Sequence, residues 1–519
     1  MTATTDDTAV PPAAAAVALD PPLAARDLPA EPAPPTPAPA TPAPVPATVD
    51  TTLVLRILVL STFVVILNET IMVNAIPRLM RDFAVPATSA QWLSTAFMLT
   101  MAVVIPATGW FLQRVRTRTA YALAMGLFVT GTALAAAAPT FGVLLAARVV
   151  QASGTAVMMP LLMTTMMTLV APQDRGRVMG NVTLVMSVAP ALGPAVSGVL
   201  LQLGSWRLIF AVVLPIAGVT ALLGLRALVD IGEPSATRID LPSVVLSAVG
   251  FGALVYGLSG LGEGGRASHA VPPLLVTVVG VLALAAFALR QVRQQRGAGP
   301  LLDLRTLTFG PFTIALALMC SAFMAMMGAM ILLPLYLQDV LGLSTLSTGL
   351  LLMPGGLAMG VLGPVVGRAY DRLGAPRLVI PGAVVMAGTL ALFTQVTPQT
   401  SPWLVLAAHV VLMVSLALIF TPVFTSGLSV LPPHLYAHGS AVLGSLQQVA
   451  AAAGTAVVVS VMAGRAATAA EGGAAPLAAL SDGIRWGFGV GAVLAVAAVG
   501  IAFAVRTPAT TGEGGPAGH

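Results

Sequence analysis

The stretch Leu53–Ile76, LVLRILVLSTFVVILNETIMVNAI, decides the fold, because its only charged residues are Arg56 and Glu69. An α-helix rises 1.5 Å per residue, so about 20 apolar residues cross a hydrocarbon core of about 30 Å. The apolar residues run continuously instead of alternating, which argues against a strand of a membrane β-barrel. The stretch therefore predicts a membrane-spanning helix that carries an acidic residue, Glu69.

Similar apolar runs follow along the chain and predict an all-α polytopic membrane protein. Hydrophobic residues make up 57% of the chain and charged residues 8%, against about 25% charged residues in an ordinary soluble domain. With the first stretch, the runs give fourteen expected transmembrane helices: 53–76, 91–112, 119–138, 142–168, 178–202, 207–229, 241–261, 271–289, 312–337, 347–369, 378–396, 403–428, 439–463 and 484–505.

The basic residues predict the orientation. All 24 are arginines, which is typical of a GC-rich bacterial genome, and the net charge is +5. They are scattered between the apolar runs, so we expect no nucleic-acid partner. An even number of spans puts both termini on one side, and that side holds sixteen arginines against six on the other. The positive-inside rule then predicts cytoplasmic termini. With the arginine-only composition, we expect a multi-pass protein of the bacterial inner membrane.

The chain divides into five expected parts. Proline and alanine dominate the first of them, a composition that favours an extended, unpacked chain. The parts are a disordered cytoplasmic tail (1–50), a six-helix bundle (51–229), two extra transmembrane helices with linkers (230–306), a second six-helix bundle (307–506) and a cytoplasmic tail (507–519).

A weak internal repeat relates the second and tenth runs. One ends in Gly109-x-x-x-Gln113-Arg114 and the other in Gly367-x-x-x-Asp371-Arg372. Both lead into short basic segments, and we expect these six residues in cytoplasmic gating loops. Parallel halves of this kind are a recurring design of transporters, with the substrate bound between them.

Two ionisable residues lie well inside the expected spans, Glu69 and Arg148. Charges are costly there and functional by default. Both positions are about 6–10 Å from the bilayer centre on the same side, so the two groups could pair or share a polar cavity. Glu69 is the candidate proton site, with Arg148 tuning it; the alternatives are a structural glutamate and a hydrogen-bonding hub at Arg148.

Four further side chains on the same two spans are candidates for the substrate cavity: Asn68, Asn74, Gln151 and Met158. Gln151 is one turn from Arg148 and shares its face. Alternatively, the three amide side chains hydrogen-bond to neighbouring helices and hold them together. The alternative role of Met158 is ordinary packing. In the fifth span, Pro190, Gly193, Pro194 and Gly198 are expected to bend the helix and let it pack closely.

Catalytic chemistry has no support in the sequence. It contains no GxxxxGK[ST] loop, no HExxH motif and one cysteine, Cys320. His434 and His438 stand four residues apart, which alone is weak support for a metal site. We expect no enzyme, no metal and no cofactor, and uphill transport would use the proton gradient.

At these positions the chain resembles the fourteen-helix drug–proton antiporter family (EmrB/QacA-like) of the major facilitator superfamily, over about residues 53–505. Leu67–Pro77, LNETIMVNAIP, is similar to the first-helix signature L-D-x-T-I-V-N-V-A-L-P. Arg148–Gly154 resembles the R-x-x-Q-G motif, and Ala191–Gly198 resembles the antiporter motif of the fifth helix. Asn68 stands where the first-helix signature has aspartate, and the acid is displaced to Glu69. Gln113 stands where the family usually has an aspartate after the second helix. The Asn-Glu-Thr sequence and the Gln113-Arg114 pair resemble the lincomycin-efflux-type branch.

The resemblance implies a major facilitator fold of two six-helix bundles plus two inserted helices. It also implies proton-coupled export of small lipophilic or cationic compounds by alternating access, as in multidrug and antibiotic efflux, by a protein expected to be a monomer in the lipid bilayer. One alternative is a dedicated exporter of a single endogenous metabolite or lipid. The other is a membrane sensor that transports nothing.

Overall fold

Fourteen helices of the described residues are long and apolar enough to cross a membrane, which confirms the expected count and the all-α fold class. The computed structural model describes residues 50–230, 240–262, 271–295 and 300–506, without the side chains of residues 73, 74, 87, 88, 194 and 262. All described residues belong to one compact unit. The expected tails, apart from Asp50, and parts of the 230–306 segment lie outside the described residues.

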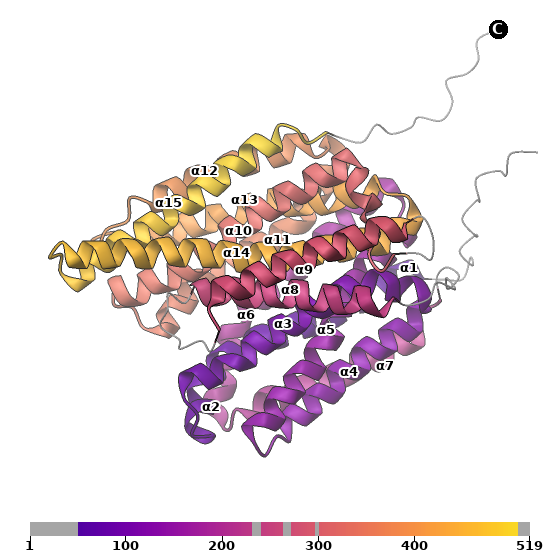
Figure 1. The fold of residues 1–519 in the computed structure, drawn as a ribbon, viewed down its shortest axis with the longest axis horizontal. Helices are drawn as coiled ribbons and strands as arrows, with labels where there is room; N and C mark the ends of the chain where they lie inside the picture. Colours follow the sequence, from indigo (N-terminus) through magenta and orange to yellow (C-terminus); the bar gives the residue numbers. More distant parts are fainter. Residues whose placement is uncertain (1–49, 231–239, 263–270, 296–299, 507–519) are drawn as a thin grey trace, which may run out of the picture. The chain divides into compact units, whose positions relative to one another are not determined.

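The longer helices are shown in Figure 1. Their bounds are α1 Thr51–Ile71, α2 Ile76–Asp82, α3 Ala87–Arg114, α4 Thr117–Ala136, α5 Phe141–Leu169, α6 Arg175–Leu203, α7 Arg207–Ala227, α8 Leu241–Gly262, α9 Pro273–Gln294, α10 Gly310–Leu335, α11 Thr345–Leu373, α12 Pro376–Phe393, α13 Pro402–Ser429, α14 Tyr436–Glu471 and α15 Pro476–Ala502. Short helical turns are η1 Met72–Ala75, η2 Pro172–Asp174, η3 Leu304–Thr308, η4 Tyr336–Val340 and η5 Pro433–Leu435.

The helix ends follow from local chemistry. Proline occupies the first turn of α9, α10, α12, α13 and α15, where its missing N–H has no helical partner to lose. Thr140 and Ser344 accept hydrogen bonds from backbone N–H groups in the first turns of α5 and α11. Gly374, with φ 77°, ends α11. The first span differs from its expected bounds, because α1 ends at Ile71 and η1 and α2 continue the chain.

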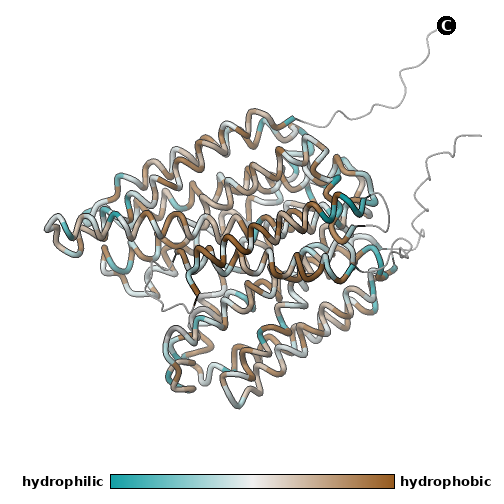
Figure 2. The backbone as a smooth tube through the Cα atoms, viewed as in Figure 1, coloured by the Kyte–Doolittle hydropathy of each residue, from teal (hydrophilic) through white to brown (hydrophobic). Residues whose placement is uncertain are grey.

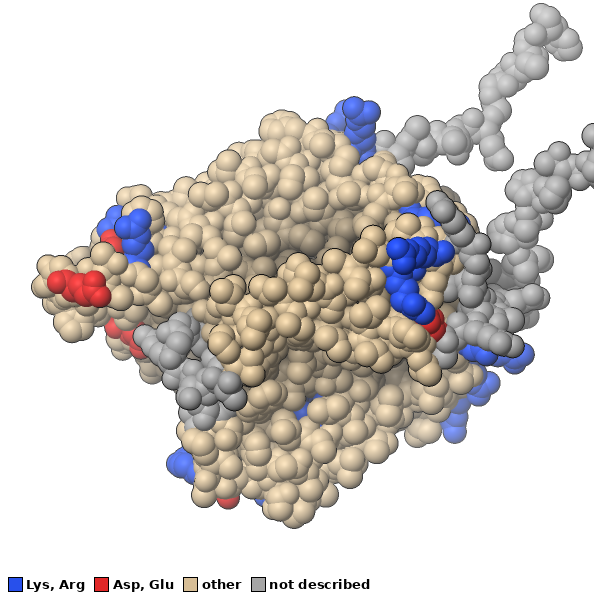
Figure 3. Space-filling view, in the orientation of Figure 1, with Lys and Arg blue, Asp and Glu red and all other residues tan. Residues whose placement is uncertain are grey.

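Large apolar side chains cover the outer surface, in keeping with a lipid surrounding. Leu274, Leu282 and Leu289 on α9 are each more than 60% exposed, and brown, hydrophobic backbone dominates α8 and α9 in Figure 2. Charged residues gather at the two ends, with a broad belt of other residues between them (Figure 3). Exposed leucine is costly in water but not in lipid.

One end of the bundle holds most of the described arginines, and we name it the basic end. It is formed by the starts of α1, α4, α6, α8, α10, α12 and α14 and by the ends of α3, α5, α7, α9, α11, α13 and α15. Its arginines are Arg56, Arg114, Arg116, Arg118, Arg175, Arg177, Arg226, Arg290, Arg293, Arg305, Arg368, Arg372, Arg377 and Arg506. The opposite end has Arg78, Arg81, Arg207, Arg465 and Arg485.

The helices pack in two groups. Helices α1 and α3–α7 contact one another, and so do α10–α15. Between the groups, α6 lies along α11 and α3 along α14. The α6–α11 contact is close, because a Cβ atom on Gly180 would clash with the Gly363 carbonyl and one on Gly367 with the Gly176 carbonyl. Small residues allow such backbone contact between helices in a membrane.

Each of these two contacts is called a seam. Helix α8 lies beside the α3–α14 seam, and α9 packs against α8 (Figure 1). α8 packs against both α3 and α14. The rings of Trp92 and Tyr256 stack with centroids 5.9 Å apart, and Ser460 donates to the Leu261 carbonyl. At the basic end, Asp240 accepts two hydrogen bonds from Arg290, at 2.7 and 2.9 Å. These bonds hold the pKa of the Asp240 carboxyl well below its usual range. The pair ties the start of α8 to the end of α9.

We predict that Gly154→Ala destabilises the protein by about 1–3 kcal/mol, because an added Cβ would clash with the Ala124 carbonyl where α5 meets α4. Thermal unfolding of purified protein, followed by tryptophan fluorescence, measures the effect. The matched control is Gly126→Ala on α4, where a Cβ meets nothing within 4 Å. Equal melting temperatures for the two variants would contradict the close contact.

Candidate functional site

Glu69 and Arg148 lie near each other in the first group of helices. Glu69 is half-buried two residues before the end of α1, and Arg148, 1% exposed, lies two turns into α5. Measured along the helix axes, Glu69 and Arg148 lie about 10–12 Å from the midpoints of α1 and α5, respectively. Both are displaced towards the end opposite the basic end. The two groups interact electrostatically, yet no direct ion pair joins them among the ion pairs of the described residues.

The guanidinium of Arg148 is held from three directions. Its Nη1 donates to Gln151 Oε1 at 2.7 Å, and its Nε donates to the Leu93 carbonyl at 3.4 Å. The Phe97 ring of α3 lies beneath it, with 4.0 Å from Cζ to the ring centroid. Buried cations need such partners. Arg148 is therefore a fixed positive charge at the level of Glu69.

A hydrogen-bond chain continues from Arg148 into α4. Gln151 Nε2 donates to Thr132 Oγ1 at 2.8 Å, and Thr132 donates to the Phe128 carbonyl at 2.7 Å. The spacing in the sequence predicts Gln151 beside Arg148, but nothing in the sequence pointed to Thr132 and Phe97 as further partners. Helices α4 and α5 can approach closely because Gly131 has no side chain. A Cβ atom there would lie 2.6 Å from the backbone nitrogen of Gln151.

The other first-span candidates differ in position. Asn68 is 0% exposed, and among the described residues neither polar atom of its amide has a hydrogen-bond partner. Thr70, on another face, donates to the Ala189 carbonyl at 3.4 Å and contacts Gly193 of α6. Glu69, next to Asn68, is therefore flanked by a buried amide and by the α1–α6 contact. The side chain of Asn74 lies outside the described residues.

The fifth-span motif lies within α6, which runs without interruption from Arg175 to Leu203. A Cβ on Gly193 would clash with Thr70, while Gly198 has nothing within 4 Å. Pro190 is half-buried, and the side chain of Pro194 is not described. Close contact between α1 and α6 therefore depends on Gly193 rather than Gly198.

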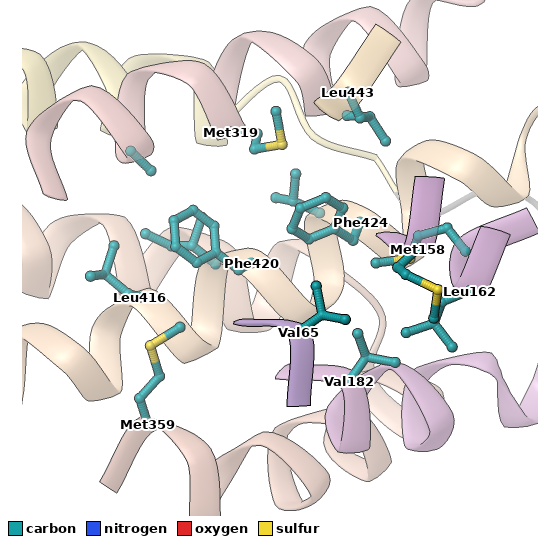
Figure 4. Packing of buried hydrophobic residues seen from close by; sticks show 14 of the residues in the cluster. Val65, Met158, Leu162, Val182, Met319, Met359, Leu416, Phe420, Phe424 and Leu443 are labelled. Atoms are coloured by element: carbon teal, nitrogen blue, oxygen red, sulfur yellow. The ribbon is translucent and has the colours of Figure 1, made fainter. Parts of the chain in front are cut away.

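Apolar side chains close the space between the two groups of helices. Figure 4 shows Val65, Met158, Leu162 and Val182 facing residues of the second group. We name this set the central plug; its members from the second group are Met319, Met359, Leu416, Phe420, Phe424 and Leu443. All are 7% exposed or less. Met158, expected in a cavity, is thus packed in the plug in this conformation.

Polar contacts join the two groups at the basic end. Asp371 of α11 accepts from the backbone N–H groups of Gly176 and Arg177, both at 2.8 Å, at the start of α6. A carboxylate there also meets the positive end of the helix dipole. On the other seam, Gln113 Nε2 donates to the His434 carbonyl at 2.5 Å. These contacts close the basic end.

The six residues of the internal repeat do not lie in loops, contrary to our expectation. Gly109, Gln113 and Arg114 belong to the last turns of α3, and Gly367, Asp371 and Arg372 to those of α11. The helices continue past the apolar runs, and the backbone N–H groups of Val115 and Gly374 still donate to the Phe111 and Tyr370 carbonyls at their ends. Arg114 lies with its Cζ 5.7 Å from the Trp110 ring centroid.

Comparisons with known proteins identify the family. A profile of the Major Facilitator Superfamily matches residues 58–455. The uncharacterized MFS-type transporter YcnB of Bacillus subtilis is 39% identical over 466 residues, which cover 90% of this chain and 97% of that protein. The lincomycin resistance protein LmrB of Listeria monocytogenes is 36% identical over 441 residues, 84% of this chain and 93% of that protein.

More distant relatives agree. The multidrug resistance protein Stp of Mycobacterium tuberculosis is 28% identical over 411 residues, 78% of this chain and 74% of that protein. Among solved structures, the human organic anion transporter MFSD10 aligns with a TM-score of 0.60 at 15% identity, covering 87% of this chain and 99% of its own. The proton:xylose symporter XylE aligns with a TM-score of 0.62 at 17% identity, covering 88% and 96%. The chain belongs to the Major Facilitator Superfamily, as a fourteen-helix membrane transporter homologous to drug-resistance proteins.

Proposed function

We propose that the chain is a proton-coupled antiporter that exports small lipophilic or cationic compounds across the bacterial inner membrane by alternating access. The single observation that carries the proposal is the half-buried Glu69 beside the fixed charge of Arg148. The names of LmrB and Stp, lincomycin and multidrug resistance proteins, add support by homology.

The proposed proton site depends on two opposing effects. A carboxylate among apolar helices is disfavoured, while a nearby guanidinium favours it. Moving the carboxyl relative to Arg148, or admitting water, would therefore change its affinity for protons. In the proposed cycle, Glu69 binds a proton from outside and releases it inward while the substrate moves out. Arg148, which is hydrogen-bonded to Gln151 and the Leu93 carbonyl, stays in place as the fixed positive charge relative to which Glu69 moves.

The closed basic end fits one state of this cycle. We propose that the basic end, and with it both termini, faces the cytoplasm, as the excess of arginine favours. The contacts of Asp371 and Gln113 then shut the cytoplasmic side. Towards the other end, Glu69, Thr70 and Pro190 are only half-buried. In this state the proposed proton site would receive protons from outside.

We predict that Glu69→Gln abolishes transport driven by a pH gradient while the protein still inserts and folds, because the amide cannot take up a proton. Proteoliposomes with an imposed pH gradient and a panel of lipophilic dyes and antibiotics measure it. The matched control is Asp339→Asn, an exposed carboxyl in η4, which should transport like the parent protein. Parental pH-driven transport by Glu69→Gln would refute the proton site.

We predict that Asp371→Asn loosens the basic end, because the amide loses the charge at the start of α6. A cap of this kind contributes about 1 kcal/mol, so the open fraction should rise about fivefold. Maleimide labelling of Val182→Cys in the central plug, with Cys320→Ala, reports opening.

The control for this measurement is Asp174→Asn. Asp174 precedes α6 directly, yet its side chain makes no capping hydrogen bond. Its labelling rate should equal that of the parent. Equal labelling rates for Asp371→Asn and Asp174→Asn would show that Asp371 does not hold the gate.

A further inference from the structure

His438 lies where α3 and α14 approach most closely at the basic end. It belongs to the first turn of α14 and is 4% exposed. A Cβ atom on Gly109 of α3 would lie 2.7 Å from His438 Nδ1 and 3.3 Å from its Cα. The imidazole therefore fills a space that exists only because position 109 is glycine.

One ring nitrogen of His438 acts as an acceptor. The backbone N–H of Asp303 donates to His438 Nδ1 at 3.3 Å, so Nδ1 carries no proton in this arrangement. Asp303 is itself buried, and its carboxylate pairs with Arg305 at 2.9 Å. The neighbouring Leu302 N–H donates to Gln291 Oε1 of α9 at 3.1 Å. His438 thus connects α14 to the segment that leads from α9 into α10.

The charged groups around the ring are few. The ring interacts electrostatically with Asp303, which directly precedes η3, with Arg305 in η3 and with His434 in η5. On its own helix Tyr436 is nearby, and on α3 the last turn carries Gln113 and Arg114. A second ring proton would gain attraction from Asp303, but it would meet repulsion from Arg305 and remove the acceptor of the Asp303 N–H. The closed contact therefore requires a neutral imidazole.

The two seams differ in what holds them. On the α6–α11 seam the carboxylate of Asp371 binds backbone N–H groups. On the α3–α14 seam the corresponding position is the neutral Gln113. The titratable side chain enclosed in that second contact is His438. Its charge state, and not that of a carboxylate, then decides whether this seam closes.

We propose that His438 is a positioning residue of the transport cycle. The neutral imidazole holds α3 and α14 in contact at the basic end, as a latch, and the protonated imidazole lets them separate. Acid on that side favours the open form, because the imidazolium is hydrated only when the seam has parted. Release increases as the pH falls below about 6.5, where a hydrated imidazole takes up a proton. The latch is separate from the proton site proposed at Glu69.

The test measures the distance across the seam by electron paramagnetic resonance in nanodiscs. Spin labels on Thr119→Cys, in the first turn of α4 beside α3, and on Thr308→Cys, in η3 beside α14, flank the seam. Both positions are exposed, and both are labelled in a Cys320→Ala background. The background protein also carries Glu69→Gln, so that protonation of Glu69 cannot change the measured distance. A negative result would then count against the His438 proposal and not against the proton site at Glu69. We expect the long-distance population to rise at least about fivefold from pH 8 to pH 5.

His438→Asn keeps an acceptor for the Asp303 N–H but cannot be protonated, so its distance should stay short at pH 5. His438→Gln is a second variant with the same expectation. The control His434→Asn changes an exposed histidine nearby and should keep the response. The proposal is overturned if the seam does not open with acid in the background protein, or if the His438 variants open as that protein does.

Discussion

A guanidinium buried among membrane helices is the constraint on which the rest of the site depends. Placing an arginine at the centre of a membrane helix costs about 2.5–3.5 kcal/mol on insertion scales, and Arg148 is 1% exposed. Its partners come from α3 and from its own helix, and the chain of bonds ends in α4. Such short bonds require close helices, which explains why glycine stands at positions 131 and 154.

This fixed charge gives the half-buried Glu69 its proposed role, and the closed basic end gives the role a direction. The central plug and the contacts of Asp371 and Gln113 separate the site from the basic end. The two ends would then have different tasks: proton exchange towards the end near the half-buried Glu69, and gating by polar contacts at the closed basic end. Two packings of one chain, differing in which side is sealed, are what alternating access requires.

The fourteen spans followed from the lengths of the apolar runs, because lipid imposes a minimum length that soluble cores do not. The cost of polar groups in lipid singled out Glu69 and Arg148, their similar depth predicted that they are near each other, and the helical spacing put Gln151 beside Arg148. The central plug did not, because lipid is as apolar as a protein core and Phe420 or Met319 in a sequence looks like a lipid-facing residue. The contacts of Asp371 and His438 join segments distant in sequence, so spacing carried no signal for them, and the loop expected around Gly109 was wrong.

Proton release on substrate binding tests the central claim most directly. Purified protein in weakly buffered detergent, with a pH-sensitive dye and a lipophilic cation as ligand, reports whether the ligand displaces a proton. We expect release from the parent protein and none from Glu69→Gln, although this variant still binds the ligand. Equal release from both proteins would contradict the assignment of Glu69 as the group that exchanges protons.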